Sequence, residues 1–185
     1  MKSIIQPQRL KEITDSFGSL SPIIVVGDIG IDKYTQGTVR RISPEAPVPV
    51  LEVEKEWLKL GLAANISHNL QALGVKAITC GVVGEDKNAD SFEELLEEIG
   101  LSTWGLIRSE CRPTIFKERV TTPTQQICRI DYEKNHPISV DVENRLFDRI
   151  LENLEETKTE GKRAIVLEDY AKGTMTENLI RKIGR

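Results

Sequence analysis

Residues 21–32 read Ser-Pro-Ile-Ile-Val-Val-Gly-Asp-Ile-Gly-Ile-Asp, and this stretch decides the fold. The run from Ile23 to Val26 is apolar at every position, so both of its faces need to be covered. A strand that is covered on both faces is typical of a parallel sheet with helices on either side. Gly27 and Asp28 follow directly, which predicts a turn at the carboxyl end of the strand, where such sheets gather their functional groups.

Two more apolar runs follow the same plan, at Ala77–Val83 and at 164–168. Gly84 ends the first of them, and Asp169 comes directly after the second. Amphipathic patterns typical of helices lie at residues 63–73, 89–99, 141–157 and 174–183. Strands that alternate with helices in this way predict an α/β fold, with a mostly parallel sheet that is flanked by helices.

Residues 33–53 and 114–132 have β-type composition but are more polar than these runs. Three prolines interrupt the first region, and proline has no N–H group to donate to a neighbouring strand. We therefore expect an edge or projecting pair of strands there. The turn signal Thr122-Pro123-Thr124 divides the second region, which predicts a hairpin that joins the first pair in a small β lid.

Length and composition narrow the domain count and the partners. The 185 residues suit one domain with a small appendage, and we divide them into a leading helix at 1–20 and a domain at 21–185. The formal net charge is -4, so no basic field points to nucleic acid as a partner. There is no run of ~18 apolar residues, no secretion signal and no metal-ligand spacing among the cysteines. We expect a cytoplasmic protein without a membrane segment or a protein-bound metal.

Polar groups that suit a small ligand lie after two of the strands and at the start of a helix. Asp32 follows the first strand, where its carboxylate can accept hydrogen bonds from adjacent sugar hydroxyls. Gly61 lets a ligand approach the backbone at the helix entry, and Asn65 offers a donor and an acceptor. Asp169 and Lys172 lie in a strand-to-helix turn that suits a transferred phosphoryl group. Ordinary turn and helix-capping roles explain the same spacing, so both interpretations stay open.

Cationic side chains alternate along the second lid region. Lys117 and Arg119 are two residues apart and therefore point to the same face of a strand, and Arg129 follows in the next strand. Two like charges on one face need an anion between them. That anion is either the phosphate of a ligand or a carboxylate such as Asp131 or Glu133, and the sequence leaves both alternatives open.

Together these segments resemble the PfkB (ribokinase-like) carbohydrate kinases, in the same order along residues 20–178. The resemblance is carried by Asp32, by Ala63-Ala64-Asn65, by Lys117 and Arg119, and by the run Asp169–Gly173. Residues 41–50 read Arg-Ile-Ser-Pro-Glu-Ala-Pro-Val-Pro-Val, a stretch typical of the heptose 7-phosphate kinases within that family.

The resemblance implies an enzyme that uses ATP and Mg to phosphorylate the anomeric hydroxyl of D-glycero-β-D-manno-heptose 7-phosphate, in the synthesis of ADP-heptose for the lipopolysaccharide core. It implies that Asp32, Gly61 and Asn65 hold sugar hydroxyls. It implies that the remainder of the sugar phosphate is held by Lys117, Arg119, Gln126 and Arg129. It also implies a homodimer that forms through the lid strands.

The chain departs from the family pattern in two places. Leu62 stands where the family has the second of two glycines, and a leucine there restricts the backbone next to the sugar. The family's Gly-Ala-Gly-Asp motif, which supplies the catalytic base and cradles phosphate, does not occur in the sequence. We expect that base downstream of Arg185 or on a separate chain that supplies the C-terminal half of the fold. We also expect no turnover by this chain alone.

Two alternatives accompany this interpretation. The first is a non-catalytic module, derived from a kinase, that binds a sugar phosphate or mediates dimerisation; the absent base and Leu62 favour it. The second keeps the family but changes the substrate to a fructose phosphate, ribose or adenosine, and residues 41–50 argue against it by resemblance.

Overall fold

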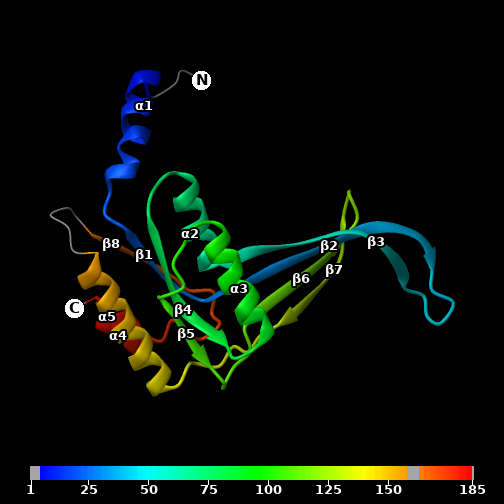
Figure 1. Ribbon diagram of the computed structural model, residues 1–185. Helices are drawn as coiled ribbons and strands as arrows, with labels where there is room; N and C mark the ends of the chain where they lie inside the picture. Colours follow the sequence, from blue (N-terminus) through cyan, green and yellow to red (C-terminus); the bar gives the residue numbers. More distant parts are fainter. Residues whose placement is uncertain (1–4, 158–162, 185) are drawn as a thin grey trace.

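The computed structural model describes residues 5–157 and 163–184, which form two β-sheets with helices around one of them (Figure 1). The first sheet is the core sheet, with the strand order β5-β4-β1-β8 and parallel pairing throughout. Its strands are β1 (Ile23–Gly27), β4 (Ala77–Gly84), β5 (Leu106–Ser109) and β8 (Ala164–Glu168). The predicted α/β fold with a mostly parallel sheet is therefore confirmed.

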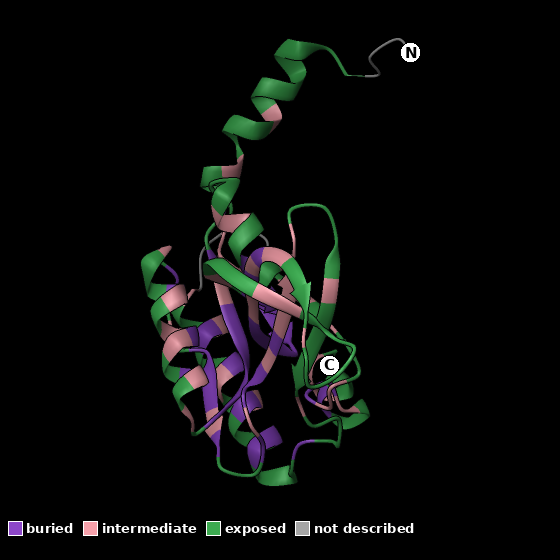
Figure 2. Cartoon of the chain, turned by 90° about the vertical axis from the view of Figure 1, so that its right-hand side faces the viewer, coloured by how far each residue is buried: buried purple, intermediate pink, exposed green. Residues whose placement is uncertain are grey.

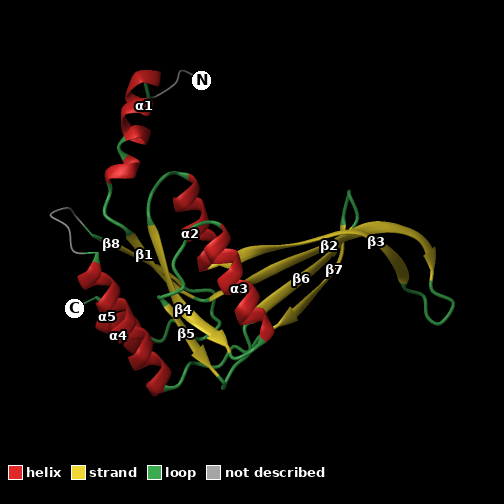
Figure 3. Cartoon of the chain, viewed as in Figure 1, coloured by secondary structure: helices red, strands yellow, loops and turns green. Residues whose placement is uncertain are grey.

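Helices cover both faces of the core sheet, as Figure 3 shows. The helices are α2 (Ala63–Ala72), α3 (Lys87–Glu98), α4 (Val140–Glu156) and α5 (Glu177–Ile183). Val25 packs in one apolar cluster with residues of α2 and α3, whereas Ile24 and Val26 pack in another with residues of α4 and α5. Successive residues of β1 thus point to opposite layers, which is why the run has no polar position.

The sequence predicted β1, β4 and β8 but not β5. β5 is only four residues long and includes Arg108, so it lacks an apolar run of the kind that marks the other three. Gly105 precedes it, and a Cβ atom there would lie 2.1 Å from the backbone oxygen of Thr79 on β4. The close approach of two backbones, and not an apolar run, therefore marks where this strand begins.

The second sheet is the lid sheet, with the strand order β3-β2-β6-β7. Its strands are β2 (Ile29–Ile42), β3 (Pro49–Leu62), β6 (Ile115–Thr121) and β7 (Gln126–Tyr132). β2 pairs with β3 and β6 pairs with β7 in antiparallel hairpins, and β2 pairs with β6 in parallel. The lid projects from the core, as predicted (Figure 1).

The strands of the first lid hairpin are longer than the predicted region 33–53. β2 begins at Ile29 and β3 ends at Leu62, and Ile31 and Leu60 at their base are buried. Pro49 is the first residue of β3, where a missing N–H group does not interrupt the pairing, and the other two prolines lie in the loop before it. The prolines therefore mark the tip of the hairpin and not a break within it.

The leading helix α1 (Pro7–Asp15) and a short 3-10 turn, η1 (Phe17–Ser19), precede the core. None of their residues is buried, and Figure 2 shows α1 standing away from the remainder of the molecule. The helix predicted in the leading segment 1–20 is present as α1. The division into domains at 1–20 and 21–185 stays a prediction.

Candidate functional site

A pocket of about 460 Å³ lies where the lid meets the core. β2, β3, β6 and β7 contribute to it, together with the start of α2 and the turn that follows β8. Its lining residues are Asp32, Tyr34, Lys59, Leu60, Leu62, Asn65, Lys117, Arg119, Arg129 and Tyr170. Five residues that the sequence singled out thus line one pocket, namely Asp32, Asn65, Lys117, Arg119 and Arg129.

The register of the lid sheet explains why these side chains share one face. Asp32 on β2 lies opposite Lys59 on β3 and opposite Lys117 on β6. Two residues further along β2, Tyr34 lies opposite Arg119. Residues that lie opposite one another across strands point to the same side of a sheet, and alternation along each strand repeats the pattern. A polar alternation in the sequence therefore becomes one charged wall of the pocket.

Carboxylates separate the cations of this wall. Arg119 donates to Oδ1 of Asp32, and Arg129 donates to both oxygens of Asp131 at 2.8 and 2.9 Å. Lys117 Nζ lies 3.2 Å from Oδ2 of Asp131. The Arg129 guanidinium holds the pKa of Asp131 below its ordinary value; partial burial opposes this effect and Lys117 adds to it. The carboxylates, one of the two anions that the sequence left open, thus pair with these cations.

Glu133, directly after β7, connects the lid to the core. Its Oε2 atom lies 2.5 Å from Nζ of Lys117, and its Oε1 atom lies 2.6 Å from Nζ of Lys172 in the turn after β8. Burial alone would raise the pKa of Glu133, but the two ammonium groups outweigh it and the pKa lies below its ordinary value. Glu133 is therefore an ionised carboxylate that is shared by two lysines.

Asp28 organises the turn at residues 169–174. Its carboxylate is fully buried and accepts hydrogen bonds from the backbone N–H groups of Tyr170, Lys172 and Thr174, each at 3.0 Å. The turn contains Gly173 at φ +90°, which glycine adopts freely, and Ala171 at φ +56°, which a residue with a Cβ atom adopts chiefly where its surroundings enforce it. The buried carboxylate thus gives this turn its shape.

The two candidate residues of this turn do not cap α5. Asp169 accepts the N–H group of Ala171 through Oδ1 at 2.7 Å, and Lys172 points to Glu133. Thr176 caps the helix instead, because its hydroxyl accepts the N–H group of Leu179. Asp169 is therefore a turn residue, and Lys172 has its ammonium group at the junction of the turn and the lid.

Arg112 is a charged residue of this junction that the sequence analysis missed. It is 4% exposed, and its Nη2 atom donates to the backbone oxygen of Lys134 at 2.9 Å and to that of Lys172. Burial lowers its pKa, although the charge of Asp28 opposes this effect. Among the described residues, its Nη1 atom has no hydrogen-bond partner. No local sequence pattern marks an arginine in a loop as buried. Its burial follows only from the packing of its own loop against the segments that contain Lys134 and Lys172.

The helix entry places Leu62 in a conformation that suits glycine. Leu62 has φ +57° and ψ -136°, precedes the first residue of α2 and lines the pocket. A non-glycine residue in this region costs about 1–3 kcal/mol. At Gly61, an added Cβ atom would lie 3.1 Å from Oδ2 of Asp32, so glycine leaves room for that carboxylate. The structure at this entry thus suits glycine at both positions 61 and 62, although residue 62 is a leucine.

Gln126 is the one predicted residue of the phosphate group that does not line the pocket. It is exposed and lies opposite Thr121, nearer the tip of the hairpin than the pair Arg119 and Arg129. Conversely, Lys59 and Tyr170 line the pocket, although neither was predicted as a site residue. The pairing of Lys59 with Asp32 shows why, because register across strands cannot be read from spacing along one strand.

Aromatic side chains form one end of the wall. Tyr34 stacks on Trp57 with ring centroids 5.0 Å apart, and Lys59 and Arg119 each lie 5.5 Å from the Tyr34 ring. Such rings offer an apolar surface beside polar groups, a combination that is common in small-molecule pockets. Within the described part of the chain, no group of three or more His, Cys, Asp or Glu residues is placed to hold a metal ion. No helix in that part is long and apolar enough to cross a membrane.

The fold and this pocket agree with one class of protein. The family described as pfkB family carbohydrate kinase matches residues 24–178, and the chain belongs to this family. The resemblance that the sequence motifs carried is thereby confirmed.

The curated relatives narrow the comparison. The chain is 40% identical over 164 residues to the bifunctional protein HldE of Helicobacter pylori strain J99, which covers 89% of this chain and 34% of the relative. It is 41% identical over 161 residues to the HldE of Methylobacillus flagellatus, covering 87% of this chain and 32% of the relative. The chain thus spans about a third of the length of these relatives.

Solved structures share the fold. A putative phosphofructokinase from Staphylococcus aureus matches with a TM-score of 0.65 at 15% identity, over 87% of this chain and 48% of that one. Phosphofructokinase-2 of Escherichia coli in complex with fructose-6-phosphate matches with a TM-score of 0.63 at 13% identity, over 89% and 50% of the two chains. At this identity the likeness establishes the ribokinase-like fold, with its core sheet and its lid.

Proposed function

We propose that this chain is the sugar-binding part of an ATP-dependent kinase that phosphorylates the anomeric hydroxyl of D-glycero-β-D-manno-heptose 7-phosphate, in the route to ADP-heptose and the lipopolysaccharide core. The observation that carries the proposal is the pocket between lid and core, where a cationic wall faces a helix entry. The likeness to the HldE proteins supports this choice of sugar phosphate over other substrates of the family.

One end of the pocket suits sugar hydroxyls. The bond from Arg119 uses Oδ1 of Asp32, and Oδ2 faces Gly61, where no side chain blocks it. An ionised carboxylate held in this way accepts hydrogen bonds from neighbouring hydroxyls. Asn65 lies in the first turn of α2 and offers both a donor and an acceptor at the same end of the pocket.

The cationic side chains, which lie beside Asp32 across the strands, suit the sugar's phosphate group. Four cations and one carboxylate are among the residues that line the pocket: Lys59, Lys117, Arg119 and Arg129 against Asp32. A phosphate ester carries about -1.5 to -2 charges near neutral pH, which compensates this excess. We propose that Lys117, Arg119 and Arg129 bind it, and that Gln126 takes no part because it lies outside the pocket.

Phosphoryl transfer needs groups beyond this pocket. ATP, with Mg on its phosphates, would supply the phosphoryl group and offset its charge; Asp169 and Lys172 are the residues of this chain that would face it. We propose that sequence outside these 185 residues, or a separate chain, supplies the base, so that this chain alone binds the sugar without turnover.

The lid also supports a proposed homodimer. Ile42, Val48 and Val53 of the first hairpin region and Ile130 and Tyr132 of β7 are large apolar residues that are exposed. Apolar side chains on projecting strands are typical of surfaces that pair with another chain.

The alternative function is a non-catalytic module that binds sugar phosphate or dimerises. The strained Leu62 at the pocket favours this alternative.

Calorimetry tests the proposal directly. We expect heptose 7-phosphate to bind this chain, heptose without phosphate to bind more weakly, and ATP to be consumed only when a C-terminal half with the Gly-Ala-Gly-Asp motif is added. K117M should weaken binding of the phosphorylated sugar, whereas K33M should not, because Lys33 pairs with Glu56 and Glu118 on the opposite face of the lid. The absence of sugar-phosphate binding by the wild-type chain would rule out the proposal, and binding without any turnover in the completed protein would favour the non-catalytic module.

A further inference from the structure

Glu133 holds two lysines that come from different parts of the molecule. Lys117 belongs to the lid strand β6, and Lys172 belongs to the turn after β8 in the core. Each lysine bonds to a different oxygen of the carboxylate, at 2.5 and 2.6 Å. The three side chains are 9%, 14% and 18% exposed for Lys117, Glu133 and Lys172, so this junction is largely shielded from water.

This arrangement is that of an anion between two cations. A phosphate group offers the same acceptor oxygens as a carboxylate, but has more of them and carries more charge. Lys117 lines the pocket, whereas Glu133 does not, so the pocket approaches Lys117 from one side and Glu133 holds it from another. A phosphate in the pocket and the carboxylate of Glu133 therefore compete for the same ammonium group.

We propose that Glu133 competes with the ligand's phosphate for Lys117. A bound phosphate draws the Lys117 ammonium group away from Glu133, which then keeps Lys172 as its lysine partner. The inference rests on the proposed function in one respect, that the ligand is a phosphorylated sugar. It adds that binding is coupled to the contact between lid and core, because Glu133 is the carboxylate that joins Lys117 to Lys172.

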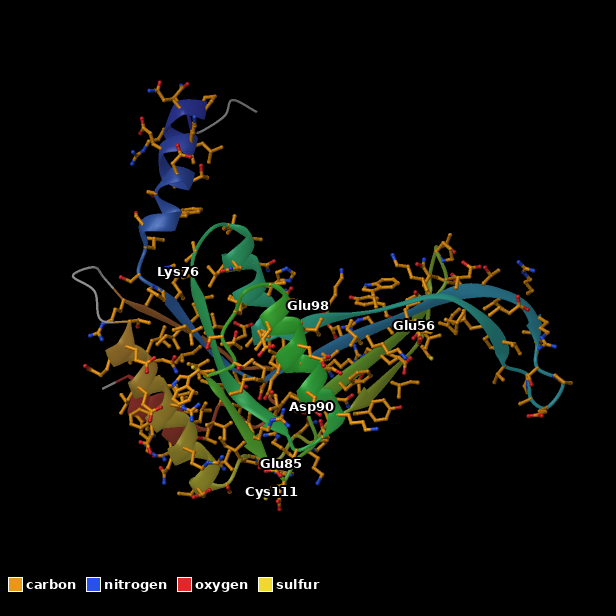
Figure 4. All side chains as sticks on the ribbon, viewed as in Figure 1. Glu56, Lys76, Glu85, Asp90, Glu98 and Cys111 are labelled. Carbon is orange, nitrogen blue, oxygen red and sulfur yellow. The ribbon has the colours of Figure 1, made fainter. Side chains whose placement is uncertain are left out.

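The lid provides a matched control on its opposite face. Glu118, also on β6, accepts from the hydroxyl of Thr35 at 2.7 Å and pairs with Lys33 at 3.2 Å. Glu56, labelled on the lid in Figure 4, belongs to the same group and pairs with Lys33 at 2.7 Å. Glu118 thus resembles Glu133 in residue type and in having a lysine partner, but it does not line the pocket.

The test compares wild-type protein with E133Q and E118Q by calorimetry. The probes are inorganic phosphate, heptose 7-phosphate and heptose without phosphate. Glutamine keeps the shape of the side chain and removes its charge, so E133Q should bind both phosphate-bearing probes about tenfold more tightly, from the lost repulsion at short range. Binding of the unphosphorylated heptose should not change, and E118Q should behave as the wild type.

A measurement on the wild type keeps the proposal testable if E133Q does not fold. Carbon NMR of the Glu133 carboxyl should show its pKa rising toward the ordinary value when inorganic phosphate saturates the protein, because Lys117 leaves it. An unchanged pKa, or E133Q binding phosphate equally or less tightly, would overturn the inference while sugar-phosphate binding by the wild type would still support the proposed function. Tighter phosphate binding by E133Q, with no sugar phosphate bound by either protein, would support the inference and remove the proposed function. No binding of any probe by either protein would overturn both.

Discussion

Two carboxylates that lie four residues apart, Asp28 and Asp32, define two regions of different character. Asp28 is fully buried, and backbone N–H groups of the turn at 169–174 surround it. Asp32 has a side chain that is 21% exposed at the lid pocket, and its partner is the side chain of Arg119. Backbone donors are fixed by the fold, whereas a side-chain partner can be exchanged for a ligand. The first carboxylate therefore builds structure, and the second is placed to bind.

A substitution of Asp28 should have the largest effect, and it tests whether the buried carboxylate builds structure. D28A leaves the N–H groups of Tyr170, Lys172 and Thr174 without their acceptor in a buried site, and it removes the opposite charge near Arg112. We expect a loss of about 3–5 kcal/mol in the free energy of unfolding, measured by urea denaturation. A loss below about 1 kcal/mol would mean that the turn holds its shape without Asp28.

The corresponding change at Asp32 should act on binding instead. D32N weakens the contact with Arg119 and removes the charged acceptor of the pocket. We expect heptose 7-phosphate to bind roughly ten- to a hundredfold more weakly, the effect of a hydrogen bond to a charged group, with a change in unfolding free energy below about 1 kcal/mol. Calorimetry and denaturation of the same sample separate the two effects, and large destabilisation with unchanged binding would contradict the comparison.

The sequence predicts these two regions unequally. The core strands β1, β4 and β8 are local apolar runs, so their existence follows from residues that are adjacent in the chain. Asp32, Lys117 and Arg119 were found because spacing along a strand fixes the face to which a side chain points. The bond between Glu133 and Lys172 joins the end of β7 to the turn after β8, and the burial of Arg112 depends on the same packing. Long-range contacts of this kind have no local signal.

Leu62 lies in the binding region, but its strained backbone conformation lowers the stability of the fold. L62G removes the strain at φ +57°, worth about 1–3 kcal/mol, and adds the chain entropy of glycine, which opposes it by about 0.5–1 kcal/mol. We expect a net gain of about 1 kcal/mol in the free energy of unfolding and tighter binding of heptose 7-phosphate. L62A is the control, since it shortens the side chain but keeps the strained Cβ atom; equal effects of both variants would assign the change to side-chain bulk.

The smallest expected effect concerns the junction between the two regions and depends on pH. The pKa of Glu133 lies below its ordinary value near 4.5, so its ionised form stabilises the folded protein above that value. This contribution is lost as the pH falls through the lowered pKa, where Glu133 takes up a proton and releases Lys117 and Lys172. E133Q should therefore be slightly less stable than the wild type at pH 7, by about 1 kcal/mol or less, because Lys117 keeps its second partner Asp131 and glutamine avoids the cost of burying a carboxylate. The difference should shrink as the pH falls below 4.5. Thermal denaturation of both proteins across this range measures it. A difference that stays constant with pH would show that Glu133 stabilises the junction by packing and not by charge. The proposed competition between Glu133 and a ligand phosphate would then have no electrostatic basis.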